Sequence, residues 1–158
     1  MLIEIRNLSV LPKISSSLSN LKSVNLRFGW RIGPSEDMLE YSILKSAIKN
    51  YDKINSKKYD KYLLIGDMLE LGSHSKKLHQ SIAPIINQTK IKKVFVKGKM
   101  ASLIFKNISK AKRGRILFDK LEIIELIKKD LNNNDYLMIK ASLATGFNNI
   151  VKDLKGLN

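Results

Sequence analysis

The sequence predicts an α/β fold in which helices flank one mainly parallel β-sheet. From about Tyr59 onward, short apolar segments alternate with stretches of helical periodicity, which is typical of consecutive βαβ units. The apolar segments are continuous and do not alternate with polar residues, as expected of strands that helices cover on both faces. A length of 158 residues, with 44% hydrophobic and 27% charged residues, suits one folded domain.

The first 58 residues carry a weaker pattern than the rest of the chain. Residues 15–20 are rich in Ser and Asn, and a strand is predicted around residues 26–32, before a turn at residues 33–34. The apolar residues of segment 42–51 are spaced for an amphipathic helix. The alternation of helices and strands is therefore predicted to begin before Tyr59.

Four strands of the expected sheet follow. Each is a short apolar run, bounded by polar or turn-forming residues. The predicted strands are residues 62–65, 94–96, 115–118 and 136–139.

Helices are predicted between these strands. Residues 75–86 place Leu78, Ile82 and Ile85 on one face, and Pro84 is expected to kink or end this helix early.

The next helix is predicted to begin with a cap. Asp119, with Glu122 three residues later, resembles a capping arrangement, and the buried side of the helix is expected to carry Leu121, Ile124 and Ile127. Residues 132–135 then make a turn, and a last helix is predicted at about residues 146–154.

Composition restricts the possible chemistry. The chain has no cysteine, which excludes disulfides, thiolate catalysis and cysteine-bound metals, and it has two histidines, His74 and His79. We therefore expect no metal site, and no group of residues stands out as catalytic. No apolar run approaches the roughly 20 residues that cross a bilayer, and the amino end lacks the regions of a secretory signal, so a cytoplasmic location is expected.

The formal net charge of +15 raises an alternative function, a non-enzymatic basic module that binds RNA or DNA. The lysine pairs are spread along the chain, however, and are not gathered in one stripe with interleaved aromatic residues. Abundant Ile and Asn accompany them, as an AT-rich coding bias would produce. We therefore favour a solvated basic surface, and disfavour nucleic acid and membrane as partners.

Polar residues follow three of the predicted strands at the points where these strands end. In an open α/β sheet the ligand crevice lies beyond the carboxyl ends of the strands. These positions hold Asp67 and Glu70 after the first strand, Lys97 and Lys99 after the second, and Lys140 and Ser142 at the end of the last.

This set suits a small zwitterionic ligand. Lys140 would pair with a carboxylate, and Asp67 or Glu70 with an ammonium group, beside the hydroxyl of Ser142. Asp67 has an equally weighted alternative role, as a cap of the following helix or turn. A lysine that closes an apolar strand needs a partner or water, which slightly favours a functional role for Lys140. Of the others, Lys99 is interpreted as a solvated loop charge.

Three segments of the chain match segments of one known family. The first is Leu-Ile-Gly-Asp-Met-Leu-Glu-Leu-Gly at residues 64–72, followed by Ser-Lys-Lys-Leu-His at residues 75–79. Val-Phe-Val-Lys-Gly at residues 94–98 is similar to the family's next strand. Asp-Tyr-Leu-Met-Ile-Lys-Ala-Ser at residues 135–142 is similar to its Val-Lys-Gly-Ser segment. From about Tyr59 to its end, the chain thus resembles the Mur ligases that add D-alanyl-D-alanine.

The resemblance implies a Rossmann-like C-terminal domain that takes in D-alanyl-D-alanine. In the full-length family, a central domain uses ATP and magnesium to activate the carboxylate of UDP-N-acetylmuramoyl-tripeptide during peptidoglycan synthesis. This chain has no Gly-x-x-x-x-Gly-Lys-Ser/Thr loop. We therefore expect a truncated ligase that binds neither ATP nor magnesium alone and is inactive alone, with the missing ligase domains as candidate partners.

Upstream of about Tyr59 the resemblance weakens and then fails. Residues 18–28 are similar to the hinge between the central and C-terminal domains, where Leu26 replaces the glycine of the family's Gly-Arg pair and Arg27 becomes the candidate nucleotide-binding residue. Residues 33–41 replace the family's Asp-Ser-Tyr-Asn-Ala-Asn-Pro-like string. We therefore expect residues 1–35 to be a degraded remnant of the central-domain end and hinge, and residues 36–158 to form the C-terminal domain.

Overall fold

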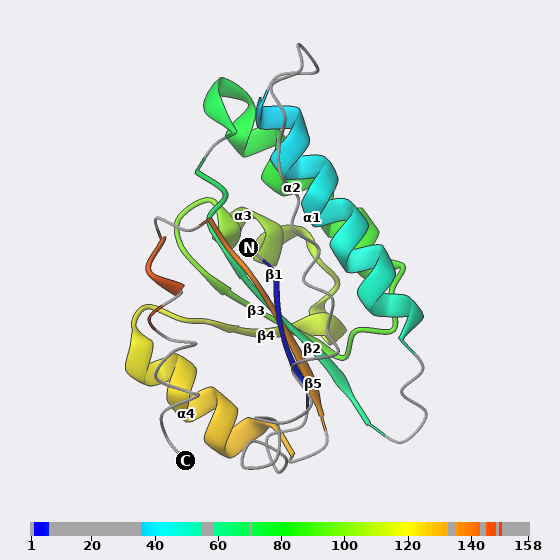
Figure 1. Cartoon of the computed structure of the whole chain (residues 1–158), viewed down its shortest axis with the longest axis vertical. Coiled ribbons are helices and arrows are strands. Elements are labelled where there is room, and N and C mark those ends of the chain that lie inside the picture. The colour runs from blue at the N-terminus through cyan, green and yellow to red at the C-terminus, as the bar shows by residue number, and fades with distance from the viewer. Residues whose placement is uncertain are drawn as a thin grey trace, which may run out of the picture.

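The computed structural model describes residues 2–6, 36–54, 59–69, 71–132, 135–142, 145–147 and 149. These residues form one five-stranded sheet with helices on both faces (Figure 1). The strand order is β1-β5-β2-β3-β4. The strands are β1 (Leu2–Arg6), β2 (Lys61–Gly66), β3 (Lys93–Lys97), β4 (Arg113–Ile116) and β5 (Tyr136–Lys140).

Strands β2, β3, β4 and β5 are parallel, and β1 is antiparallel to β5 at one edge of the sheet. The predicted α/β fold class is therefore confirmed, with an antiparallel edge strand added to a parallel sheet. The first, second and last predicted strands lie within β2, β3 and β5.

The third predicted strand is displaced. Strand β4 ends at Ile116, two residues before the predicted end. Leu117 is buried, and its N–H still donates to the carbonyl of Val96, but the Phe118 side chain is 77% exposed. The register between β3 and β4 shifts between Val94 and Val96, as in a β-bulge.

In the described part of the chain, four helices cover the sheet. They are α1 (Glu36–Lys53), α2 (Ser75–Asn87), α3 (Ala101–Asn107) and α4 (Lys120–Asp130), and short 3-10 turns lie at Gly72–His74 and Lys110–Lys112. Figure 1 shows α4 on the opposite side of the sheet from α1 and α2. No helix in the described ranges is long and apolar enough to cross a membrane.

Alternate residues of the strands divide the core into two layers. One layer packs buried side chains of α1, α2 and α3 against Leu63, Ile65, Val96 and Met138. The other layer packs α4 against the strand residues that point to the opposite face of the sheet, such as Leu64. This two-sided burial is the reason for the continuous apolar runs in the sequence.

The sequence analysis expected Pro84 to kink or end helix α2 early, and the helix does not end there. It continues to Asn87, with Pro84 on its exposed side and Ala83 and Ile86 fully buried. Proline removes one intrahelical hydrogen bond. Burial of the residues around Pro84 stabilises the last turn of the helix. The N–H groups of Gln88 and Thr89 donate to the carbonyls of Ile85 and Ile86 at its end.

The cap of α4 is confirmed, but its buried face is rotated from the predicted one. Asp119 Oδ1 accepts the N–H of Glu122 at 2.9 Å, and the Glu122 carboxylate accepts the N–H of Phe118 at 2.6 Å. Leu121, expected to be buried, is 73% exposed. The buried residues are Ile123, Leu126 and Ile127, because the helix packs on the sheet along this stripe.

Several predicted features lie outside the described residues. They are the Ser/Asn-rich stretch, the strand at residues 26–32, the turn at 33–34 and most of the last helix.

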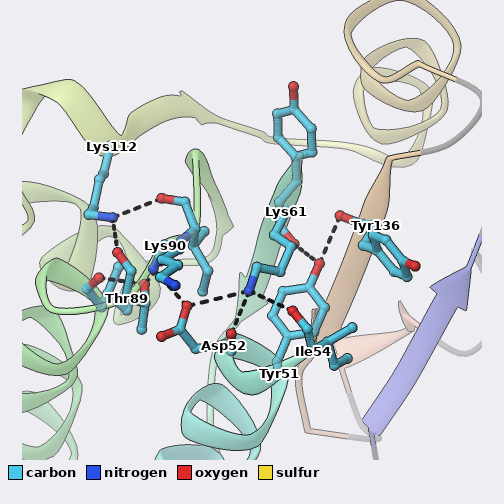
Figure 2. A network of polar contacts seen from close by, with 11 residues as sticks. Tyr51, Asp52, Ile54, Lys61, Thr89, Lys90, Lys112 and Tyr136 are labelled. Carbon is cyan, nitrogen blue, oxygen red and sulfur yellow. Dashed lines mark hydrogen bonds and ion pairs between the residues drawn. The ribbon is translucent and has the colours of Figure 1, made fainter. Parts of the chain in front are cut away.

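The C-terminal end of α1 is fastened to the amino ends of the central strands (Figure 2). The Tyr51 hydroxyl lies 3.0 Å from the carbonyl oxygen of Tyr62 in β2 and 2.8 Å from that of Tyr136 in β5. The buried ammonium of Lys61 donates to the carbonyls of Asp52 and Ile54 and lies 3.5 Å from the Asp52 carboxylate. The bonds from Lys61 satisfy the carbonyl of Asp52, in the last turn of the helix, and that of Ile54, just after it.

Lys112 makes a similar contact next to this network. Its Nζ donates to the carbonyls of Thr89 and Ile91, at 2.6 and 2.8 Å. Burial lowers the pKa of Lys112 from the ordinary value of 10.5. Folding therefore disfavours the charged form, and this stability cost is relieved as pH rises through the folded pKa toward 10.5.

Replacing Tyr51 with Phe tests the contribution of this hydroxyl. Tyr51→Phe removes the donor shared by two central-strand carbonyls, and we expect it to lower the free energy of unfolding by about 1–2 kcal/mol. Urea denaturation measures the change. Tyr41→Phe, on the same helix, is the matched control, since none of the described contacts involves its hydroxyl. Equal losses in both variants would contradict the assignment.

Candidate functional site

The carboxyl edge of the parallel strands brings three of the predicted ligand-binding residues together. In the register of β2 with β5, Ile65 pairs with Lys140. Two residues further along each strand, the N–H of Ser142 donates to the carbonyl of Asp67 at 3.2 Å. Asp67, Lys140 and Ser142 therefore lie on neighbouring strand ends, and Lys97 ends the next strand, β3.

Asp67 connects the end of β2 to α3. Its Oδ1 accepts the N–H of Ala101, the first residue of α3, at 2.7 Å. The capping role considered from the sequence is thus present, but toward α3 and not toward the helix that follows Asp67 in the chain. Within the described residues, no hydrogen bond involves the other carboxylate oxygen, Oδ2. The bond from Ala101 therefore orients the carboxylate through one of its two oxygens.

A glycine allows this close approach. Gly98 has a φ of +123°, and a Cβ atom there would lie 2.3 to 2.6 Å from the carboxylate atoms of Asp67. Both the backbone conformation and the contact require the absence of a side chain. Gly98 therefore leaves the space that the Asp67 carboxylate occupies.

Ser142 closes the loop that follows β2. Its side chain is 5% exposed, and its Oγ accepts the N–H of Leu69 at 2.9 Å. With the bond from its own N–H to Asp67, Ser142 holds this loop at both ends. These contacts of Ser142 with the loop are made to the protein backbone.

Lys140 is buried at the end of β5 with no partner in the described structure. Its side chain is 3% exposed, and it makes no hydrogen bond or ion pair with any described residue. Strand alternation puts Lys140 on the same face of the sheet as Met138, the face covered by α1 to α3. Burial of an ammonium group without a partner opposes folding, so a residue of this kind marks a candidate ligand site.

The side chains of Phe147 and His79 also lie near this edge of the sheet. The sequence analysis did not predict their contacts. The Phe147 ring is buried, and a Cβ atom on Gly66 would lie 2.6 Å both from this ring and from the Cβ of Ala141. Lys97 Nζ lies 5.9 Å from the centre of the same ring, a cation–π contact. His79 of α2 is fully buried and accepts the N–H of Met68 at 3.2 Å.

The second edge lysine lies in a more open place. Lys99 is exposed, as predicted, and with Lys97 it borders a hollow of about 260 Å³ between the ends of β3 and β4. Apolar residues Ile116, Leu117 and Phe118 form the other wall.

The remaining predicted ligand-binding residues are not placed. Glu70 and Arg27 lie outside the described residues. Within the described ranges, no group of three or more His, Cys, Asp or Glu residues is arranged to hold a metal ion.

Substitution of Gly98 tests how the Asp67 carboxylate is positioned. Gly98→Ala combines a strained φ with a clash against the carboxylate, and we expect it to lower the free energy of unfolding by about 2 kcal/mol or more. Gly146→Ala is the matched control. Gly146 also has a positive φ, +77°, but a Cβ atom there would have no neighbour within 4 Å. Urea denaturation measures the free energy of unfolding of both variants. If Gly98→Ala lowers it no more than Gly146→Ala does, the clash with the Asp67 carboxylate does not destabilise the fold.

The sequence of the chain is similar to those of two curated proteins. The chain is 32% identical over 114 residues to the UDP-N-acetylmuramoyl-tripeptide--D-alanyl-D-alanine ligase of Bacillus subtilis (strain 168), and 33% identical over 116 residues to that of Buchnera aphidicola. The matches cover 70% and 72% of this chain, but the chain spans only 23% and 24% of these relatives. No protein-family model matches the sequence.

Solved structures show the same fold. The MurF ligase from Thermotoga maritima in complex with ADP matches with a TM-score of 0.59 and 20% identity, over 73% of this chain and 26% of that one. MurF from Acinetobacter baumannii matches with a TM-score of 0.58 and 19% identity, over 73% and 25%. By sequence and by fold, the chain is similar to a part of the Mur ligases that add D-alanyl-D-alanine, which is consistent with their C-terminal domain.

Proposed function

We propose that this chain is the amino-acid-binding domain of an ATP-dependent ligase that adds D-alanyl-D-alanine to UDP-N-acetylmuramoyl-tripeptide in peptidoglycan synthesis. The observation that carries the proposal is the buried, unpartnered Lys140 beside the oriented carboxylate of Asp67. The names of the curated relatives support the choice of substrates.

A dipeptide zwitterion matches the charges at this edge. Its carboxylate would pair with the ammonium of Lys140, which would then gain the partner that its buried position lacks. Its ammonium end would meet Oδ2 of Asp67, since Oδ1 is used by α3. The domain would thereby fix the orientation of the amino group that forms the new amide bond.

The other candidate residues have subsidiary roles in this proposal. Glu70 supplies a second carboxylate near the dipeptide ammonium, and Ser142 shapes the loop that carries it. Arg27 contacts the nucleotide phosphates. Residues 36–158 form the ligase C-terminal domain and residues 1–35 correspond to the end of the central domain and the hinge, although β1 (Leu2–Arg6) pairs with the sheet of the C-terminal domain.

Activation of the tripeptide carboxylate needs groups other than those described. The described residues have no metal-binding cluster, and the sequence has no phosphate-binding loop of the Gly-x-x-x-x-Gly-Lys-Ser/Thr type. In this proposal, ATP and magnesium are therefore held by other domains of the ligase, and Arg27 reaches the nucleotide phosphates from this chain. The proposed partner for that step is the rest of the ligase.

Binding of D-alanyl-D-alanine tests the proposal directly. Lys140→Met should weaken binding at least ten-fold, because a buried charge pair with the ligand carboxylate is lost. The same variant should unfold at equal or higher urea concentration, since an unpartnered ammonium is replaced by an apolar chain of similar length. Nuclear magnetic resonance titration of the full chain measures binding.

Lys99→Met is the matched control, because it removes an exposed lysine from the same edge. It should change the affinity by less than about two-fold. Failure of the unaltered chain to bind the dipeptide would contradict the proposal. Salt-sensitive binding of an RNA or DNA oligonucleotide, without dipeptide binding, would support the basic module instead.

A further inference from the structure

His79 joins helix α2 to the loop at the carboxyl edge. Its ring has no exposed surface, and its two nitrogens face different backbone groups. Nε2 lies 3.2 Å from the N of Met68, and Nδ1 lies 2.8 Å from the carbonyl oxygen of Ser75. The Ser75 hydroxyl also lies 3.3 Å from Nδ1.

These partners fix the form of the imidazole. The Met68 N–H is a donor, so Nε2 must be the acceptor and carry no proton. The proton of the neutral ring then lies on Nδ1 and is donated to the Ser75 carbonyl. His79 is therefore oriented by its own helix and presents one acceptor to the loop.

The loop that receives this bond is tied to three separate elements. Asp67 is bonded to α3 through Ala101, Met68 to α2 through His79, and Leu69 to the segment after β5 through Ser142. The three loop residues are consecutive, and the bond to His79 is the middle one. A shift of Met68 would therefore move the groups on both sides of it.

We propose that His79 is a positioning residue for the dipeptide site, acting through the N–H of Met68 to set the Asp67 carboxylate and the Leu69–Ser142 contact. The choice of ligand rests on the proposed function, whereas the positioning of the loop does not. His79 itself touches no substrate in this proposal. Its acceptor nitrogen aligns the loop before the ligand binds, which limits the ordering that binding requires.

Two variants of similar polarity separate this role from simple packing. In His79→Gln the side-chain oxygen can reach the place of Nε2 and accept the Met68 N–H. In His79→Asn the shorter side chain can retain a bond only near the place of Nδ1, so Met68 loses its acceptor. Both variants lose the ring, and a packing role alone predicts similar behaviour.

Amide hydrogen exchange of the full chain is the first measurement. We expect faster exchange at Met68, Leu69 and Ala101 in His79→Asn, by roughly ten-fold or more relative to His79→Gln, because a buried donor has lost its partner. Leu69 and Ala101 do not bond to His79, so a change in their exchange rates reports an effect that passes from His79 through Met68. Equal exchange at these amides in the two variants, or unchanged Leu69 and Ala101 in His79→Asn, would overturn the proposal.

Dipeptide titration of the same variants is the second measurement. His79→Gln should bind D-alanyl-D-alanine within about three-fold of the unaltered chain, and His79→Asn roughly ten-fold more weakly. If the unaltered chain binds no dipeptide but the exchange pattern holds, the positioning role stands and the proposed function fails. If the unaltered chain binds and the two variants bind equally well, the positioning role fails and the proposed function stands.

Discussion

The burial of β2 on both faces is the constraint on which the rest of the fold depends. All six of its residues, Lys61–Gly66, are buried, and it pairs with β3 on one side and β5 on the other. A strand in that position needs a helical layer above and below it. Helices α1, α2 and α3 supply one layer and α4 the other. Because β2, β3 and β5 run in the same direction, their carboxyl ends also meet at a single edge.

The sequence was sufficient for the parallel sheet because its signals are local. Continuous apolar runs specified the positions of β2, β3 and β5, and Asp119 with Glu122 specified the start of α4. The errors occurred where packing decides the outcome. Pro84 is tolerated because buried neighbours hold the end of α2, and Leu121 is exposed because α4 rests on Ile123, Leu126 and Ile127. No local pattern in a single sequence reports either effect.

The candidate site shows the same difference between features that local sequence signals predict and features that depend on distant residues. Placement of Asp67, Lys140 and Ser142 at one edge followed from strand ends alone, and the register of β2 with β5 confirms that proximity. Their individual contacts depend on residues distant in the chain. The Asp67 carboxylate is oriented from α3, and Ser142 is engaged by the loop after β2. Only Lys140, buried and unpartnered within the described structure, keeps a charge that the fold itself does not use.

The antiparallel strand β1 takes the edge position that β5 would otherwise hold. It pairs along the whole of β5, from Leu2 opposite Lys140 to Arg6 opposite Tyr136. Without it, β5 would be an edge strand, with a row of unpaired backbone donors and acceptors beside the apolar side chains of Leu137, Met138 and Ile139. Such an edge is a template for strand addition by a second molecule, and so for aggregation. The strand that carries Lys140 is thus an interior strand of the sheet, and a five-residue segment distant in the sequence takes its place at the exposed edge.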